Sequence, residues 1–98
     1  MNINNNNEVH FGKFKKIVGR PNQIEKIRPN IPDKYITIAV NKKPEKTALY
    51  LISGKHFDKL VSLMKKHPYF GEVRHNLEKY MNTKPQKISI EKAMDKFI

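Results

Sequence analysis

Two short apolar runs joined by a polar link constrain the fold of this chain more than any other feature of its sequence. Residues 34–40 (KYITIAV) and residues 47–52 (TALYLI) are rich in the β-branched and aromatic residues that favour strands. The link over residues 41–46 is polar and contains Pro44. A short polar link between two such runs predicts an antiparallel β-hairpin.

The register of this hairpin decides which side chains share a face. With Val40 opposite Thr47, one face becomes aliphatic, and Tyr35 and Tyr50 lie together on the other face. A shift of the pairing by one residue exchanges the two sets, because successive side chains of a strand point to opposite faces. The predicted placement of the two tyrosines therefore depends on this register.

The chain before the hairpin is expected to be mostly extended. Residues 1–8 include a run of asparagines and predict a flexible tail. Residues 9–18 fit either a helix, from the spacing of Phe11, Phe14 and Val18, or a strand, from the alternation at residues 9–11, and we favour an extended segment that would add a third strand. Residues 19–33 carry three prolines, each of which biases the preceding residue away from helix. We therefore expect a connector there, with at most one helical turn over residues 23–27.

Three helices are expected after the hairpin. Residues 54–66 follow a favourable N-cap residue, Ser53, and carry apolar side chains at helical spacing. The same spacing continues over residues 71–82 and again, after Ser89, over residues 90–98. The predicted fold class is α+β: an antiparallel hairpin, or three strands if residues 9–18 join it, covered by two to three C-terminal helices. One domain is expected over residues 9–98.

Size and composition exclude several classes of protein. A chain of 98 residues is too short for separate cofactor and substrate domains, and no apolar run approaches the ~18 residues of a spanning helix. The sequence contains no cysteine, which excludes disulfides and thiolate metal sites, and its N-terminus lacks the pattern of a secretory signal. We therefore expect a cytoplasmic protein that does not associate with membranes.

The charge of the chain points to an anionic partner. There are 20 Lys and Arg against 9 Asp and Glu, a formal net charge of +11, and the basic residues divide equally between residues 1–52 and 53–98. A domain this basic attracts polyanions, and each contact of a lysine with a phosphate releases counterions. Lysines gather before Arg20, in the hairpin link and at Lys65–Lys66. An aromatic sheet face rimmed by lysines would also suit the stacking of unpaired bases.

The predicted function is that of a small, non-enzymatic DNA- or RNA-binding protein. It would act mainly through lysine–phosphate contacts, with little sequence specificity, because base-reading surfaces favour arginine over lysine. A helix-turn-helix over residues 54–82 would place Arg74 on the reading helix, although two helices covering one sheet face explain the same pattern. The candidate nucleic-acid-binding residues are Lys13, Lys15, Lys16, Arg20, Tyr35, Lys42, Lys43, Lys46, Tyr50 and Arg74.

A protein-interaction module is the alternative interpretation. The last predicted helix carries a clean apolar stripe that would suit a groove on an acidic host protein or the seam of a homodimer. Such a module would be delivered into a host cell by a phage or a pathogen. The same stripe also suits closure of the chain's own core. The residues concerned are Ile90, Met94, Phe97 and Ile98.

Catalytic and cofactor motifs are absent from the sequence. It contains no phosphate-binding Walker loop, no dinucleotide-binding glycine motif and no H-E-x-x-H zinc motif. The four histidines, none of them in a spaced pair with a carboxylate that would indicate catalysis, are His10, His56, His67 and His75. We therefore expect no enzymatic activity, no bound metal and no cofactor.

Overall fold

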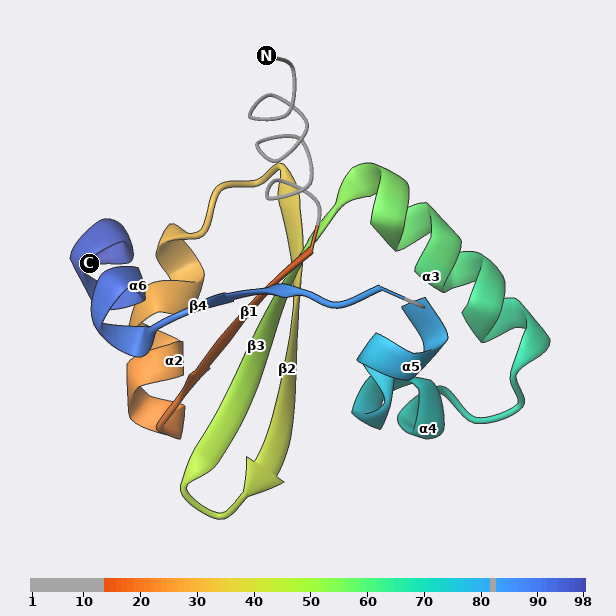
Figure 1. Cartoon of the computed structure of the whole chain (residues 1–98), viewed down its shortest axis with the longest axis horizontal. Coiled ribbons are helices and arrows are strands. Elements are labelled where there is room, and N and C mark those ends of the chain that lie inside the picture. The colour runs from red at the N-terminus through yellow and green to blue at the C-terminus, as the bar shows by residue number, and fades with distance from the viewer. Residues whose placement is uncertain (1–13, 82) are drawn as a thin grey trace.

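The computed structural model describes residues 14–81 and 83–98, so the predicted tail over residues 1–8 lies outside the described residues. Four strands form one sheet in the order β2–β3–β1–β4 (Figure 1). Neighbouring strands are antiparallel except for β4, which runs parallel to β1. The strands are β1 (Phe14–Gly19), β2 (Tyr35–Lys43), β3 (Lys46–Ser53) and β4 (Gln86–Ile88).

Helices cover both faces of this sheet, as Figure 1 shows, and the predicted α+β class is confirmed. One face carries α2 (Pro21–Ile27), which continues into a 3-10 helix (Arg28–Asn30), and α6 (Ile90–Phe97). The other face carries α3 (Gly54–Lys66), α4 (Phe70–His75) and α5 (Leu77–Met81). The two helical layers pack on separate apolar clusters that share the sheet between them.

Strand β3 supplies both clusters because it lies inside the sheet. Tyr50 and Ile52 face the layer of α3, α4 and α5, whereas Leu49 and Leu51 face α2 and α6. All four side chains are at most 1% exposed. A strand that is buried on both faces has a continuous apolar sequence instead of an alternating one, which explains the run TALYLI.

The predicted hairpin is present, but its predicted register is wrong by one residue. Val40 lies opposite Ala48, and Thr47 lies opposite Asn41. The pairing shifts between Asn41 and Lys43, where β2 contains one more residue than its partner. This irregularity beside the turn moves Tyr35 and Tyr50 to opposite faces of the sheet, where each belongs to a different cluster.

Other predicted elements differ in extent. Strand β1 begins within the expected extended segment, and α3 has the predicted bounds. The connector forms a longer helix than expected because Pro21 occupies the first turn of α2, where its missing N–H is not needed. The helix expected over residues 71–82 is broken at Asn76, whose φ of −122° and ψ of 36° lie outside the helical region. The short strand β4 was not expected.

Candidate nucleic-acid interface

Most of the positive charge on residues 14–81 and 83–98 has no carboxylate partner there. Among the lysines and arginines that the structure describes, Lys16 is the one whose side chain forms an ion pair, and its partner is Glu78. Arg28, Arg74 and several lysines contact backbone carbonyls, a threonine hydroxyl or aromatic rings, and none of these partners neutralises a charge. The surface is therefore strongly electropositive, and its shape decides where a polyanion can lie.

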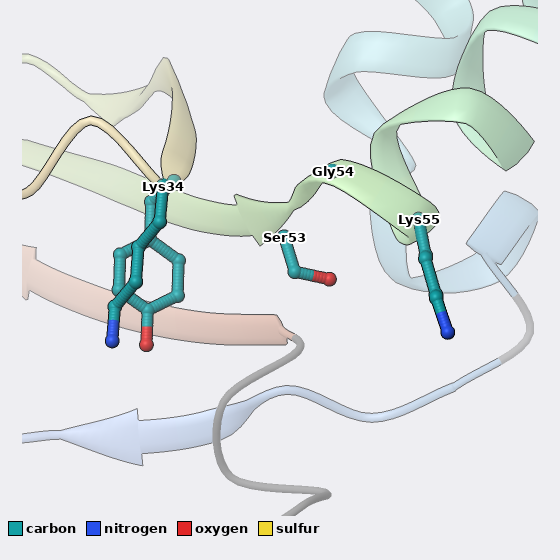
Figure 2. A pocket seen from close by; sticks show the side chains of 5 residues that line it. Lys34, Ser53, Gly54 and Lys55 are labelled. Carbon is teal, nitrogen blue, oxygen red and sulfur yellow. The ribbon is translucent and has the colours of Figure 1, made fainter.

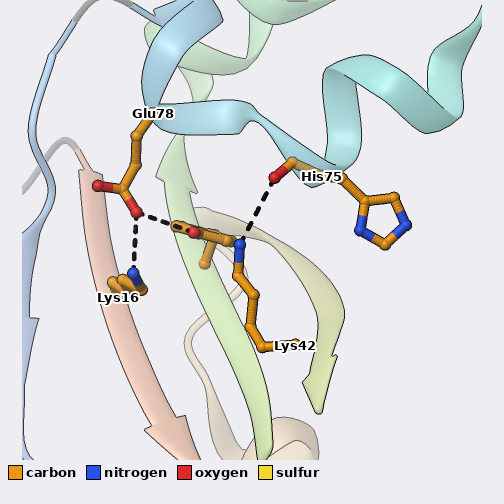
Figure 3. Close-up of polar contacts among 5 residues, drawn as sticks. Lys16, Lys42, His75 and Glu78 are labelled. Atoms are coloured by element: carbon orange, nitrogen blue, oxygen red, sulfur yellow. Dashed lines mark hydrogen bonds and ion pairs between the residues drawn. The ribbon is translucent and has the colours of Figure 1, made fainter.

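The Lys16–Glu78 pair holds α5 on the sheet (Figure 3). The Lys16 Nζ and the Tyr50 hydroxyl both donate to Glu78 Oε2, at 2.9 Å and 3.0 Å. The hydrogen bond from Lys16 is the main reason that the pKa of Glu78 is lowered. Burial, and next the bond to Glu78, raises the pKa of the Tyr50 hydroxyl. Lys16 and Tyr50 thus have a structural role, and the buried Tyr50 ring is not available to stack on a base.

The remaining predicted residues do not form one site. Lys13 lies outside the described residues. Arg74 donates from its guanidinium to the carbonyl oxygen of Ala39 on the edge strand β2. Lys15 and Tyr35 lie together near the first residues of β1 and β2. The predicted residues are thereby divided between the two ends of the sheet and the edge of β2.

At one end, four of the predicted residues gather around the hairpin turn. Arg20 directly follows β1, whose last residue pairs with Thr47, and it lines a shallow depression with Lys46 and Glu45. Lys43 and Lys46 face each other across the turn. We call this group the hairpin-end surface: Arg20, Lys42, Lys43 and Lys46.

At the opposite end, the first residues of β2 meet the end of β3 in a basic pocket. Its volume is about 410 Å³, and it is lined by Lys34, Tyr35, Ser53, Gly54 and Lys55. Figure 2 shows Lys34 and Lys55 extending in the same direction on either side of Ser53. The ammonium groups of Lys15 and Lys34 each lie 5.3 Å from the centre of the Tyr35 ring. Lys34 and Lys55 thus flank one small concavity, and Lys15 lies over the Tyr35 ring that lines it.

The first turn of α3 adds to the positive potential of this pocket. Ser53 occupies the N-cap position, yet its hydroxyl makes no capping hydrogen bond, and the first turn contains no acidic residue. The first N–H groups of a helix have no partner within it, and they give that end a partial positive charge. Gly54 is exposed, and a Cβ built on it would meet no heavy atom within 4 Å.

Helix α3 extends the basic surface away from the pocket. Its exposed side carries Lys55, Lys59, Lys65 and Lys66 against a single acid, Asp58. The Lys59 Nζ donates to the carbonyl oxygen of Met81 at 3.2 Å and keeps its charge at the surface. We call the lysines of the pocket and the helix the α3 surface: Lys34, Lys55, Lys59, Lys65 and Lys66.

The sequence prediction omitted most of the α3 surface. Lys65 and Lys66 were recognised as a local concentration of charge, but Lys34 and Lys55 are neither adjacent in sequence nor part of a lysine run. They meet because Tyr35 pairs with Ser53 across the hairpin. The signal that was available is the predicted hairpin itself, since the first residue of one strand must lie near the last residue of the other.

The apolar stripe of the last helix is used mainly within the protein. Ala93 and Phe97 are buried with α2, and Ile90 and Met94 pack against the same cluster. The side-chain amide of Asn30 donates to the carbonyl oxygen of Phe97. Of the predicted partner-binding residues, Ile98 alone is largely exposed, at 65%.

Nothing in the described ranges suggests a metal centre or a membrane span. No cluster of three or more potential ligands is present there, and each helix is too short or too polar to cross a bilayer. No family model matches the chain, and no curated protein or solved structure is significantly similar to it. The functional argument therefore depends on the surface described above.

Proposed function

We propose that the protein binds nucleic acid, without catalysing a reaction, through contacts of lysine ammonium groups with phosphates. The observation that carries this proposal is the uncompensated charge: of the described lysines and arginines, Lys16 alone pairs with a carboxylate. Unpaired surface cations repel one another, and a polyanion relieves that repulsion while its counterions are released. The predominance of lysine over arginine favours contacts with the backbone over the reading of bases.

The α3 surface is the part of the molecule best suited to a linear polyanion. The 13 residues of α3 span about 20 Å, and its exposed lysines continue from the basic pocket to the last turn. Several consecutive phosphates can therefore be contacted along one line. The α2 and α6 layer offers no comparable line, because Glu91 and Asp95 alternate with Lys92 and Lys96 on α6.

A titration of labelled oligonucleotides tests the proposal. Fluorescence anisotropy is measured with a single strand and a duplex at two salt concentrations, for the natural protein and for K55E/K66E. We expect the variant to bind every oligonucleotide about tenfold or more weakly. The slope of log affinity against log salt should be lower by about one for each lysine lost. Reversing Lys43 and Lys46 instead tests the hairpin-end surface.

The matched control reverses the same number of charges on the other helical layer. K26E/K92E alters α2 and α6, and both lysines are exposed. At 0.15 M salt, charges more than about 8 Å from the bound strand are largely screened, so the control should lose much less affinity. Equal losses in both variants would remove α3 from the interface. Salt-independent binding, or no binding by the natural protein, would refute the proposed function.

Binding of an acidic host protein is the competing proposal. Its apolar component is weakened, because the Phe97 side chain lies in the protein's own core at 8% exposure. Its electrostatic component predicts that polyglutamate displaces a bound oligonucleotide when both polymers carry the same number of negative charges. Stronger competition by polyglutamate than by nucleic acid would favour the acidic protein.

A further inference from the structure

Two neighbouring aromatic side chains stand out from the surface where α3 leads into α4. Tyr69 is 70% exposed and Phe70 is 44% exposed, and no other aromatic residue of the described chain is exposed to this degree. Neither ring makes a contact with another ring or with a cation among the described residues, whereas Tyr35, Tyr50 and Tyr80 all do. Aromatic faces left in water are a reason to look for a partner.

The surrounding residues hold this segment in place. On one side, the His67 ring packs edge-on against Tyr80 of α5, with their centres 4.6 Å apart. On the other side, Val73 of α4 is completely buried in the core. Pro68 restricts the backbone between these anchors. Tyr69 in the link and Phe70 at the start of α4 therefore lie on a braced segment, so less conformational entropy is lost when their rings bind.

Positive charge lies close to these rings in sequence. Lys65 and Lys66 occupy the last turn of α3, are exposed and form no ion pair with any carboxylate that the structure describes. Figure 1 shows that the C-terminal end of α3, and the link that follows it, lie away from the sheet. Exposed aromatic rings next to unpaired lysines combine the two elements of single-strand recognition, base stacking and phosphate contact.

We infer that Tyr69 and Phe70 stack on unpaired bases, so that the α3 surface prefers single-stranded nucleic acid to a duplex. This inference rests on the proposed function and adds the class of nucleic acid to it. In a duplex the faces of the bases are covered by their neighbours, and only unpaired bases offer a face to a protein ring. An anionic membrane is less well matched, because lysines lie at both ends of the sheet and a flat surface contacts only one side of the molecule.

The test separates bases from phosphates. Anisotropy is measured with a labelled oligothymidylate and with an abasic oligomer that has the same number of phosphates. We expect the natural protein to bind the oligothymidylate about tenfold or more tightly than the abasic oligomer. Y69A/F70A should abolish this preference without changing the affinity for the abasic oligomer. Y69F/F70Y, which keeps both rings, should bind like the natural protein.

The possible failures are distinguishable. Equal binding of the two oligomers by the natural protein, or an unchanged preference in Y69A/F70A, overturns the stacking inference and leaves the phosphate-binding proposal intact. Binding of neither oligomer refutes the proposed function itself. Vesicles of phosphatidylcholine and phosphatidylserine form a third arm: equal oligomer binding together with vesicle binding that requires Tyr69 and Phe70 overturns the inference in favour of a membrane. Circular-dichroism melts establish that each variant is folded.

Discussion

Helices α3 and α6 resemble each other in sequence and differ in how they begin. Helix α3 directly follows Ser53, the last residue of β3, and α6 directly follows Ser89, which comes just after β4. Each helix packs an apolar stripe on the sheet. In α6 the Ser89 hydroxyl accepts a hydrogen bond from the Lys92 backbone N–H at 3.2 Å, and Glu91 lies in the first turn. In α3 the Ser53 hydroxyl makes no such bond, and the first turn has no acid.

The difference shows that the partial positive charge at the start of a helix can be compensated by the chain itself or left uncompensated. The serine and the acid of α6 satisfy its first turn internally, which stabilises the helix and leaves little attraction for an external anion. The first turn of α3 instead contains Lys55 and lines the same pocket as Lys34, so its partial charge adds to theirs. We interpret α6 as an element of stability, whereas the start of α3 keeps an uncompensated positive charge.

The largest expected effect follows from deleting residues 91–98. If α6 serves stability, its removal exposes the cluster that Ala93 and Phe97 close. Each large buried side chain contributes about 1.5–3 kcal/mol of transfer free energy, against a total stability of about 5–15 kcal/mol. The truncated protein should largely lose its cooperative circular-dichroism melt. A truncated protein that melts like the natural one would break the comparison, since α6 would then be a surface available to a partner.

An intermediate effect is expected from removing the two serine hydroxyls separately. Ser89→Ala deletes a capping bond and should lower the free energy of unfolding by about 1 kcal/mol, whereas Ser53→Ala deletes none and should change it little. Urea denaturation of the two variants measures the difference directly. Equal losses would show that Ser53 caps α3 in solution and that the two helices begin alike.

The smallest effect on stability is expected from Lys55→Glu. A carboxylate in the first turn of α3 interacts favourably with the helix dipole and relieves the repulsion with Lys34, so the variant should gain about 0.3–1 kcal/mol. The same change should weaken oligonucleotide binding, because it places a negative charge where the phosphates would otherwise meet a positive one. Thermal melts and anisotropy are compared with Lys55→Gln, which removes the charge without adding an acid. A destabilised Lys55→Glu protein would contradict the electropositive first turn.

Local patterns predicted the elements that depend on local interactions. The bounds of α3 follow from Ser53 and the spacing of its apolar residues, and α6 follows Ser89 in the same way. The break at Asn76 and the strand β4 were not predicted, and for β4 the reason is physical. A strand of three residues has too little pattern of its own, and β4 exists because β1 offers it an edge.

The candidate site was predictable only where it depends on neighbours in sequence. Lys43 and Lys46 were correctly placed together, because the same turn joins them. The shared face of Tyr35 and Tyr50 was wrong, since an extra residue in β2 beside the turn changes the register, and propensities do not reveal such an irregularity. To predict that Lys34 and Lys55 line one pocket, it was necessary to know that the start of β2 lies beside the end of β3.

The parallel pairing of β1 with β4 has a consequence for the order in which the protein assembles. The ribosome synthesises β1 long before β4, with every other strand and four of the helices between them. Until residues 86–88 emerge, β1 presents an unpaired edge, which is a template for association with other chains. Contacts between segments so distant in sequence also slow folding. This edge of β1 therefore has no partner strand until β4 is synthesised, and it can associate with other chains during that interval.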